Sequence, residues 1–153
     1  MDKTLTTHEF AILAAVPEEH LLSWQKDGQE TKVAFGSMDF ELFRQADQQR
    51  GDKAVEVFIY ASLAENRPLK SEVSWHGLYV GHIQSRSGRY PKGMKYRPPS
   101  TASERPSWAI FWEVEELQPL SSPIAIASLK GLGKKSNYQS RFTPESPSLI
   151  TYP

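Results

Sequence analysis

Two segments of the sequence combine positive charge with aromatic side chains. Residues 84–105 contain six Lys or Arg residues and one acidic residue, and residues 130–141 contain four more bases. The two segments thus hold ten of the 18 bases in the chain, and tyrosines at positions 90, 96 and 138 lie among them. Cationic side chains bind phosphates, and exposed rings stack on unpaired bases. This combination predicts nucleic-acid binding.

The first segment belongs to a stretch rich in glycine and proline, which predicts a long basic loop over residues 84–107. A loop of this length in a compact domain is usually either functional or a flexible, solvated connection, and both interpretations stay open here. In the functional interpretation, seven basic residues contact the nucleic-acid backbone. These are Arg86, Arg89, Lys92, Lys95, Arg97, Lys134 and Lys135.

Residues suited to catalysis or to metal binding are few. The sequence has no cysteine and no G-x-S-x-G, Walker A or H-E-x-x-H motif. His76 and His82 share one face of an expected strand, but the rise of the strand separates them by about 20 Å, too far to bind one metal ion. We therefore expect a protein that is not an enzyme and that uses no metal or cofactor.

The composition is that of one folded domain spanning residues 1–153. Hydrophobic residues make up 39% and charged residues 24% of the chain, which excludes a disordered or collagen-like protein. Eighteen bases and 18 acids leave no formal net charge, which excludes a globally basic nucleic-acid wrapper but not a local patch. The sequence has no long apolar run and no signal-peptide core near residue 1, so we expect a cytoplasmic protein without membrane contact.

Short apolar segments separated by turn residues predict more strands than helices. Strands are expected over residues 10–16, 33–35, 55–62, 74–84 and 108–117. Helices are expected over residues 17–27, 39–50 and 124–130. Strands carry most of the apolar residues, so the expected fold is α+β, a small mixed β-barrel or sheet with peripheral helices.

The spacing of apolar residues predicts which side chains form the core. In the first two helices the inward residues are expected to be Leu21, Leu22, Trp24, Phe40, Phe43 and Ala46. The strand over residues 55–62 is expected to present Val55, Val57 and Ile59 on one face and Phe58 and Tyr60 on the other. Trp108 and Trp112 alternate with Ile110 and Val114 in the last strand, which places both tryptophans in the core.

The order of these segments resembles the EVE domain of the PUA-like group, to which YTH and ASCH domains also belong. A strand with a central Val80-Gly81, a variable loop, a strand led by Pro106-x-Trp108 and a short helix follow one another in the family's order. Upstream, residues 35–38, Gly51-Asp52 and residues 55–62 resemble the family's Gly-Val-Arg-Asn, Gly-Asp and Phe-Tyr-x-Ser blocks. The resemblance spans residues 9–150 and implies a PUA-like β-barrel.

By resemblance, such a barrel holds one nucleobase, often a modified one, in an aromatic pocket. Phe35 stands nearest to the position of the family's tryptophan, and Ser37 and Met38 replace its Arg-Asn pair. The resemblance implies a base pocket that draws on the family's blocks, with a second ring wall from Trp75 or from Tyr90 or Tyr96 of the loop. The expected pocket residues are Phe35, Gly36, Ser37, Tyr60, Ser62, Trp75, Tyr96, Gln139, Ser140 and Arg141.

The sequence therefore favours a non-catalytic module that binds DNA or RNA through one base, with a modified base as the expected ligand. Two other classes stay open. One is a small-molecule or nucleoside binder, or an ASCH-like hydrolytic barrel that uses Lys32 or Lys53 with Asp52. The other is a protein-interaction module with the 84–107 loop as its contact surface.

Overall fold

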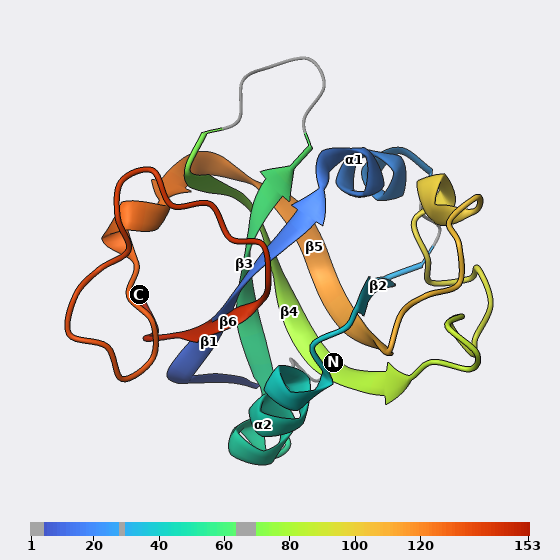
Figure 1. The fold of residues 1–153 in the computed structure, drawn as a ribbon, viewed down its shortest axis with the longest axis horizontal. Helices are drawn as coiled ribbons and strands as arrows, with labels where there is room; N and C mark the ends of the chain where they lie inside the picture. Colours follow the sequence, from blue (N-terminus) through green and yellow to red (C-terminus); the bar gives the residue numbers. More distant parts are fainter. Residues whose placement is uncertain (1–4, 28–29, 64–69) are drawn as a thin grey trace.

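The computed structural model describes residues 5–27, 30–63 and 70–153. It contains a mixed sheet of six strands in the order β2-β5-β4-β3-β1-β6, with two α-helices at its ends (Figure 1). The strands are β1 (Thr6–Pro17), β2 (Lys32–Ser37), β3 (Ala54–Ser62), β4 (Glu72–Gln84), β5 (Ile110–Ala125) and β6 (Ser148–Ile150). The helices are α1 (Glu18–Asp27), α2 (Phe40–Arg50) and the short 3₁₀ helices η1 (Pro99–Thr101) and η2 (Ile126–Ser128). The predicted α+β class is confirmed.

The sheet is mixed because β1 pairs with β3 in parallel, whereas its other strand pairs are antiparallel. The connection from β1 to β3 runs through α1, β2 and α2, and it carries β2 to the far edge of the sheet. In Figure 1, α1 and α2 lie at opposite ends of the strands, the loop after β4 covers one side and the C-terminal segment covers the other.

Two layers of apolar side chains lie on opposite faces of the central strands, as the alternation in β3 predicts. Val55, Val57 and Ile59 belong to the larger core cluster, which also takes in the buried faces of α1 and α2. Phe58 and Tyr60 belong to a second cluster, which the segment after β5 covers. A strand buried on both faces gains from β-branched and aromatic residues throughout, and the sequence of β3 fits that requirement.

The first two helices form where they were predicted. The side chain of Asp39 caps α2 by accepting a hydrogen bond from the Leu42 amide at 3.4 Å. Two apolar residues expected in the core are exposed instead: Leu22 at 48% and Phe40 at 50% of their surface. Leu22 lies one position outside the stripe that α1 buries at Leu21 and Trp24, whereas Phe40 shares the stripe of Phe43 and Ala46 but is the first residue of α2.

The helix predicted over residues 124–130 is wrong. Strand β5 continues to Ala125, and its end pairs with the start of β4 through Glu72 with Ala125 and Val73 with Ile124. Only a single 3₁₀ turn, η2, remains before Gly131. An isolated helix of seven residues is unstable, so pairing with a neighbouring strand prevails.

The 84–107 loop is folded against the sheet rather than extended into solvent. Backbone hydrogen bonds close successive turns along it, and one of them ties Tyr96 to the β2 strand through the Ala34 amide at 2.7 Å. Tyr90, Arg97 and Thr101 are buried. Tyr90 packs on Phe111 and, with Ala34, forms a third small core cluster. Within the described part of the chain, no helix is long and apolar enough to cross a membrane.

Candidate base-binding pocket

A pocket of about 350 Å³ opens where the ends of β1 and β2 meet the loop and the C-terminal segment. We call it the central pocket. Its walls are residues 14–17, His20, residues 35–39, Arg97, Glu104, Trp108, Trp112 and residues 145–147. Ligand pockets in proteins range over roughly 300–1,000 Å³, so this one suits a ligand of the size of a single nucleobase.

Three aromatic rings line the central pocket. The register between β2 and β5 places Phe35 opposite Trp112, and their rings meet at 5.0 Å between centroids. Both residues are buried and form its floor. Trp108, just before β5, is half-buried and adds a third ring. Rings around a cavity of this size offer a planar ligand stacking and edge contacts.

Gly36 allows the Trp108 indole to lie against the β2 backbone. A Cβ atom at position 36 would come within 2.4 Å of the indole atoms Cγ and Cδ1, a separation no side chain tolerates. The indole is also held at its polar end, because its Nε1–H donates to Glu104 Oε1 at 2.7 Å. The ring is therefore fixed from both sides before any ligand binds.

A buried ion pair supports this arrangement. The guanidinium group of Arg97 donates to Glu104 Oε1 at 2.7 Å and to the Ala34 carbonyl at 2.7 Å. Arg97 is only 6% exposed, and burial lowers the pKa of its guanidinium group, an effect that Glu104 opposes. An arginine remains charged even so. It ties the loop to β2 and orients the carboxylate that holds Trp108.

Polar groups line the edge of the central pocket next to these rings. The Ser37 hydroxyl oxygen accepts a hydrogen bond from the Asp39 amide at 3.0 Å, which leaves its proton free to donate. Glu104 Oε1 is taken by two donors, whereas no hydrogen bond to Oε2 is found among the described residues. The edge therefore offers a hydroxyl donor and a carboxylate acceptor to a ligand.

His20 enters the central pocket from the first turn of α1. Its Nδ1 lies 2.7 Å from the Ser100 hydroxyl oxygen, and its Nε2 lies 3.9 Å from Glu104 Oε2. Burial lowers the pKa of this imidazole, and Glu104 only partly offsets the effect. With a neutral His20, the carboxylates of Asp39, Glu104 and Glu145 outnumber the single positive charge of Arg97, so the pocket carries net negative charge.

The lowered pKa of His20 predicts a pH-dependent stability. An unfolded histidine binds a proton near pH 6.5, whereas the folded state of this residue does so only at lower pH, so the unfolded state gains protons first. The free energy of unfolding should therefore fall as the pH drops below about 6.5. Replacing His20 with Gln should flatten this fall between pH 7.5 and pH 5.5, measured by urea unfolding at several pH values. Identical slopes for the two proteins would contradict this role of His20.

Of the pocket residues expected from the sequence, Phe35, Gly36 and Ser37 line the central pocket. Four others do not. Trp75 is buried in the larger core cluster and Tyr60 in the second one. Ser62 ends β3, the strand beyond β1, where it pairs with Pro17. Tyr96 packs against the third core cluster, with the ammonium group of Lys32 4.8 Å from the centre of its ring.

The C-terminal lip of the central pocket also differs from the expectation. Residues 145–147 form it. Gln139 and Arg141 line a separate shallow hollow, and Ser140 is exposed beside them. The residues that form this lip thus lie six positions further along the chain than the expected Gln139, Ser140 and Arg141.

The expected backbone-binding residues fall into three groups. Arg86, Arg89, Lys134 and Lys135 are exposed. Lys92 and Lys95 are exposed but have acidic neighbours, at 3.1 Å from Glu113 and 3.9 Å from Glu30, respectively. The assignment of Arg97 to the nucleic-acid backbone is wrong, because its guanidinium group is buried and bound to Glu104.

Sequence reasoning missed several contributors to the central pocket, among them His20, Asp39, Glu104, Trp108, Trp112 and Glu145. Trp108 was assigned to the core from its alternation with Ile110, but it precedes the strand and turns over Gly36. The available signal was Gly36, the penultimate residue of β2, because a glycine in a strand often marks the close approach of another group.

With the geometry in place, comparison with known proteins adds no assignment: neither a protein family nor a curated protein matches this sequence.

Proposed function

We propose that this protein is a non-catalytic nucleic-acid-binding module that holds one base of DNA or RNA in the central pocket. The observation that carries the proposal is the set of three rings, Phe35, Trp108 and Trp112, around a cavity of about 350 Å³ with Ser37 and Glu104 at its edge. A base turned out of a strand presents two faces for stacking and one polar edge for hydrogen bonds. The three rings and the two polar groups match those requirements.

The charges of the central pocket favour a base with an amino group. Adenine, cytosine and guanine each carry an exocyclic amine, whereas thymine and uracil do not. The free Oε2 of Glu104 can accept from such an amine, and the net negative charge of the pocket opposes entry of a phosphate. A methyl group on the base adds apolar area against the rings and favours binding by on the order of 1 kcal/mol. A modified, amino-bearing base is therefore the ligand we propose.

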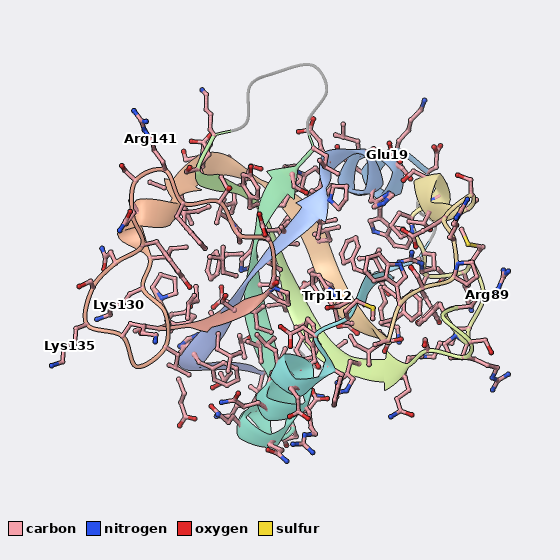
Figure 2. All side chains as sticks on the ribbon, in the orientation of Figure 1. Glu19, Arg89, Trp112, Lys130, Lys135 and Arg141 are labelled. Atoms are coloured by element: carbon pink, nitrogen blue, oxygen red, sulfur yellow. The ribbon has the colours of Figure 1, made fainter. Side chains whose placement is uncertain are left out.

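The exposed basic residues provide for the phosphates outside the central pocket. Figure 2 shows Arg89 at one end of the long axis, Lys130, Lys135 and Arg141 at the other, and Trp112 of the central pocket between them. A nucleic-acid strand that places one base in the central pocket therefore has basic residues within its path on either side of the pocket. Such contacts make affinity dependent on salt.

The resemblance to the EVE domain supports this proposal at the level of the fold. We propose that the mixed sheet is a PUA-like barrel whose side opening is the central pocket. The block that resembles the family's Gly-Val-Arg-Asn, residues 35–38, lies in the wall of that pocket. In such a domain the ring wall and the base-reading edge come from consecutive residues, here Phe35, Gly36 and Ser37.

A hydrolytic function has less support from the geometry. Lys32 lies 3.6 Å from Glu113 behind β2, and Asp52 and Lys53 are exposed in the turn after α2, so none of them lines the central pocket. Ser100, His20 and Glu104 follow one another in space, but the 3.9 Å from His20 to Glu104 exceeds a hydrogen bond. Ser100 Oγ also lies behind His20, outside the pocket lining.

The proposal is tested by fluorescence titration with short single-stranded and duplex oligonucleotides, each with and without a methylated base, at two salt concentrations. We expect the tightest binding for one oligonucleotide that carries a modified base, with an affinity that falls as salt rises. Binding of a free nucleoside with little salt dependence and no gain from an oligonucleotide would favour the small-molecule class instead. Failure of all oligonucleotides to bind the folded protein would refute the proposal and favour a protein-interaction module.

The turn that follows β4 makes a specific prediction about salt dependence. Arg86 and Arg89 bond to each other's backbone across a tight turn whose central residues, Ser87 and Gly88, both have positive φ, and both arginine side chains are exposed. If each contacts one phosphate, the double variant Arg86→Ala/Arg89→Ala should make the negative slope of log affinity against log salt shallower by about 2. Arg44→Ala, an exposed arginine on α2, is the matched control and should leave the slope unchanged. Equal salt slopes for the wild type, the double variant and Arg44→Ala would show that this turn does not contact the nucleic acid.

A further inference from the structure

A second pair of aromatic rings lies outside the central pocket, on the segment after η2. The rings of Tyr138 and Phe142 stack with centroids 4.7 Å apart and planes only 6° from parallel. Phe142 remains 37% exposed, so one face of its ring is open to solvent. Both residues line a shallow hollow together with Asn137, Gln139 and Arg141.

Backbone contacts hold this pair in place. The Tyr138 amide donates to the Leu129 carbonyl at 2.9 Å beside a β-bridge between Lys130 and Asn137. The Phe142 amide closes a turn onto the Gln139 carbonyl at 3.0 Å. The Tyr138 side chain also packs against the second core cluster. The exposed ring of Phe142 is therefore supported by an ordered part of the protein. A ligand that stacks on this ring loses little free energy to the ordering of the protein.

The surroundings of the pair are positively charged. Residues 117–144 contain four bases, Lys130, Lys134, Lys135 and Arg141, and no acidic residue. Among the described residues, none forms an ion pair with any of these four. Figure 2 shows Lys130, Lys135 and Arg141 at the same end of the molecule. The charge complements a polyanion.

The pair is also close to the central pocket along the chain. Phe142 lies three residues before Glu145, which lines that pocket. Three residues span at most about 11 Å between Cα atoms, even when fully extended. The two sites are therefore separated by a distance that a few nucleotides can bridge.

We propose that Phe142, stacked on Tyr138, is a second nucleotide subsite on which a neighbouring base of the same single strand stacks while Arg141 contacts its phosphate. This inference rests on the proposed function, because it assumes that the central pocket holds a base of that strand. An exposed ring beside unpaired cations is the arrangement that single-stranded nucleic acids bind without regard to sequence. A protein partner is the alternative occupant, but the excess of positive charge favours the nucleic acid.

The test compares Phe142→Ala with Leu132→Ala, a matched control that removes a similarly exposed apolar side chain (36%) from the same segment. The probes are a free nucleoside and a single-stranded octanucleotide that carries the same base once. Phe142→Ala should weaken octanucleotide binding by at least about 5-fold and leave nucleoside binding unchanged. Phe142→Trp should bind the octanucleotide at least as tightly as the wild type does, and Leu132→Ala should bind it with wild-type affinity.

The outcomes separate this inference from the proposed function. If nucleoside binding is intact and Phe142→Ala matches Leu132→Ala on the octanucleotide, the second subsite is wrong and the central pocket stands. If the nucleoside does not bind but octanucleotide affinity depends on Phe142, Phe142 is a stacking site on its own, and both the base pocket and its pairing with a second subsite are wrong. If neither probe binds while Phe142→Ala abolishes capture of a protein partner, the surface binds protein and the inference is overturned.

Discussion

Gly36→Ala is expected to destabilise the protein by about 1–3 kcal/mol, the cost of forcing an extra methyl group into a packed site. The new Cβ would lie 2.4–2.5 Å from three atoms of the Trp108 indole, so the ring must move. Movement breaks its hydrogen bond to Glu104 and displaces one wall of the central pocket. Base binding should therefore weaken by roughly 5-fold to 150-fold, the worth of one stacking contact. Urea unfolding and oligonucleotide titration measure the two effects.

The same pair of residues supplies the control. Trp108→Ala removes the ring and should weaken base binding as strongly as Gly36→Ala does. In the Trp108→Ala background, however, adding Gly36→Ala should cost almost no further stability, because the atoms that it would meet are gone. The double-mutant cycle should thus show a coupling between positions 36 and 108 of about 1–3 kcal/mol. Additive changes in the free energy of unfolding would contradict the contact.

Arg97→Met is expected to destabilise the fold by about 3 kcal/mol, because breaking a buried ion pair leaves an uncompensated carboxylate. The Ala34 carbonyl also loses its side-chain donor, and Glu104, the anchor of Trp108, is freed. Adding Glu104→Gln should recover part of the lost stability, since the unpaired charge is then removed. Urea unfolding of the single and double variants gives this result.

The same variant separates a structural role of Arg97 from a contact with phosphate. If Arg97 bound a phosphate, its removal would make the negative slope of log affinity against log salt shallower by about one and would leave the stability of the fold unchanged. We expect the opposite pattern, with unchanged slope and reduced stability, since the guanidinium group is 6% exposed.

Local sequence signals predicted most of the fold. The Asp39 cap, the glycine that ends α2 and the two-faced alternation of β3 all act over a few residues, and all correspond to the structure. The prediction of a helix over residues 124–130 was wrong because residues 124 and 125 pair with β4, a strand some 50 residues earlier in the chain. The spacing of apolar residues within one segment does not indicate which distant strand that segment pairs with.

The candidate site was harder to predict for the same reason. Phe35, Gly36 and Ser37 are consecutive, so one resemblance located all three. Their counterparts come from distant parts of the chain, and only the strand register decides which of them meet β2. The pairing of β2 with β5 brings Trp112 and Trp108 to the central pocket and leaves Trp75 in the core two strands away. Arg97 looked like any other loop arginine until the fold buried it against Glu104.

The measurement that tests the central claim most directly is an NMR titration of the four tryptophan indole N–H resonances with a single-stranded oligonucleotide that carries one methylated, amino-bearing base. Trp108 and Trp112 line the central pocket, whereas Trp24 and Trp75 do not and serve as internal controls. Single Trp→Phe variants assign the four resonances. Our account predicts saturable shifts of the Trp108 and Trp112 resonances and none for Trp75. Saturable binding that leaves the Trp108 resonance unmoved would show that the base lies elsewhere and would contradict the account.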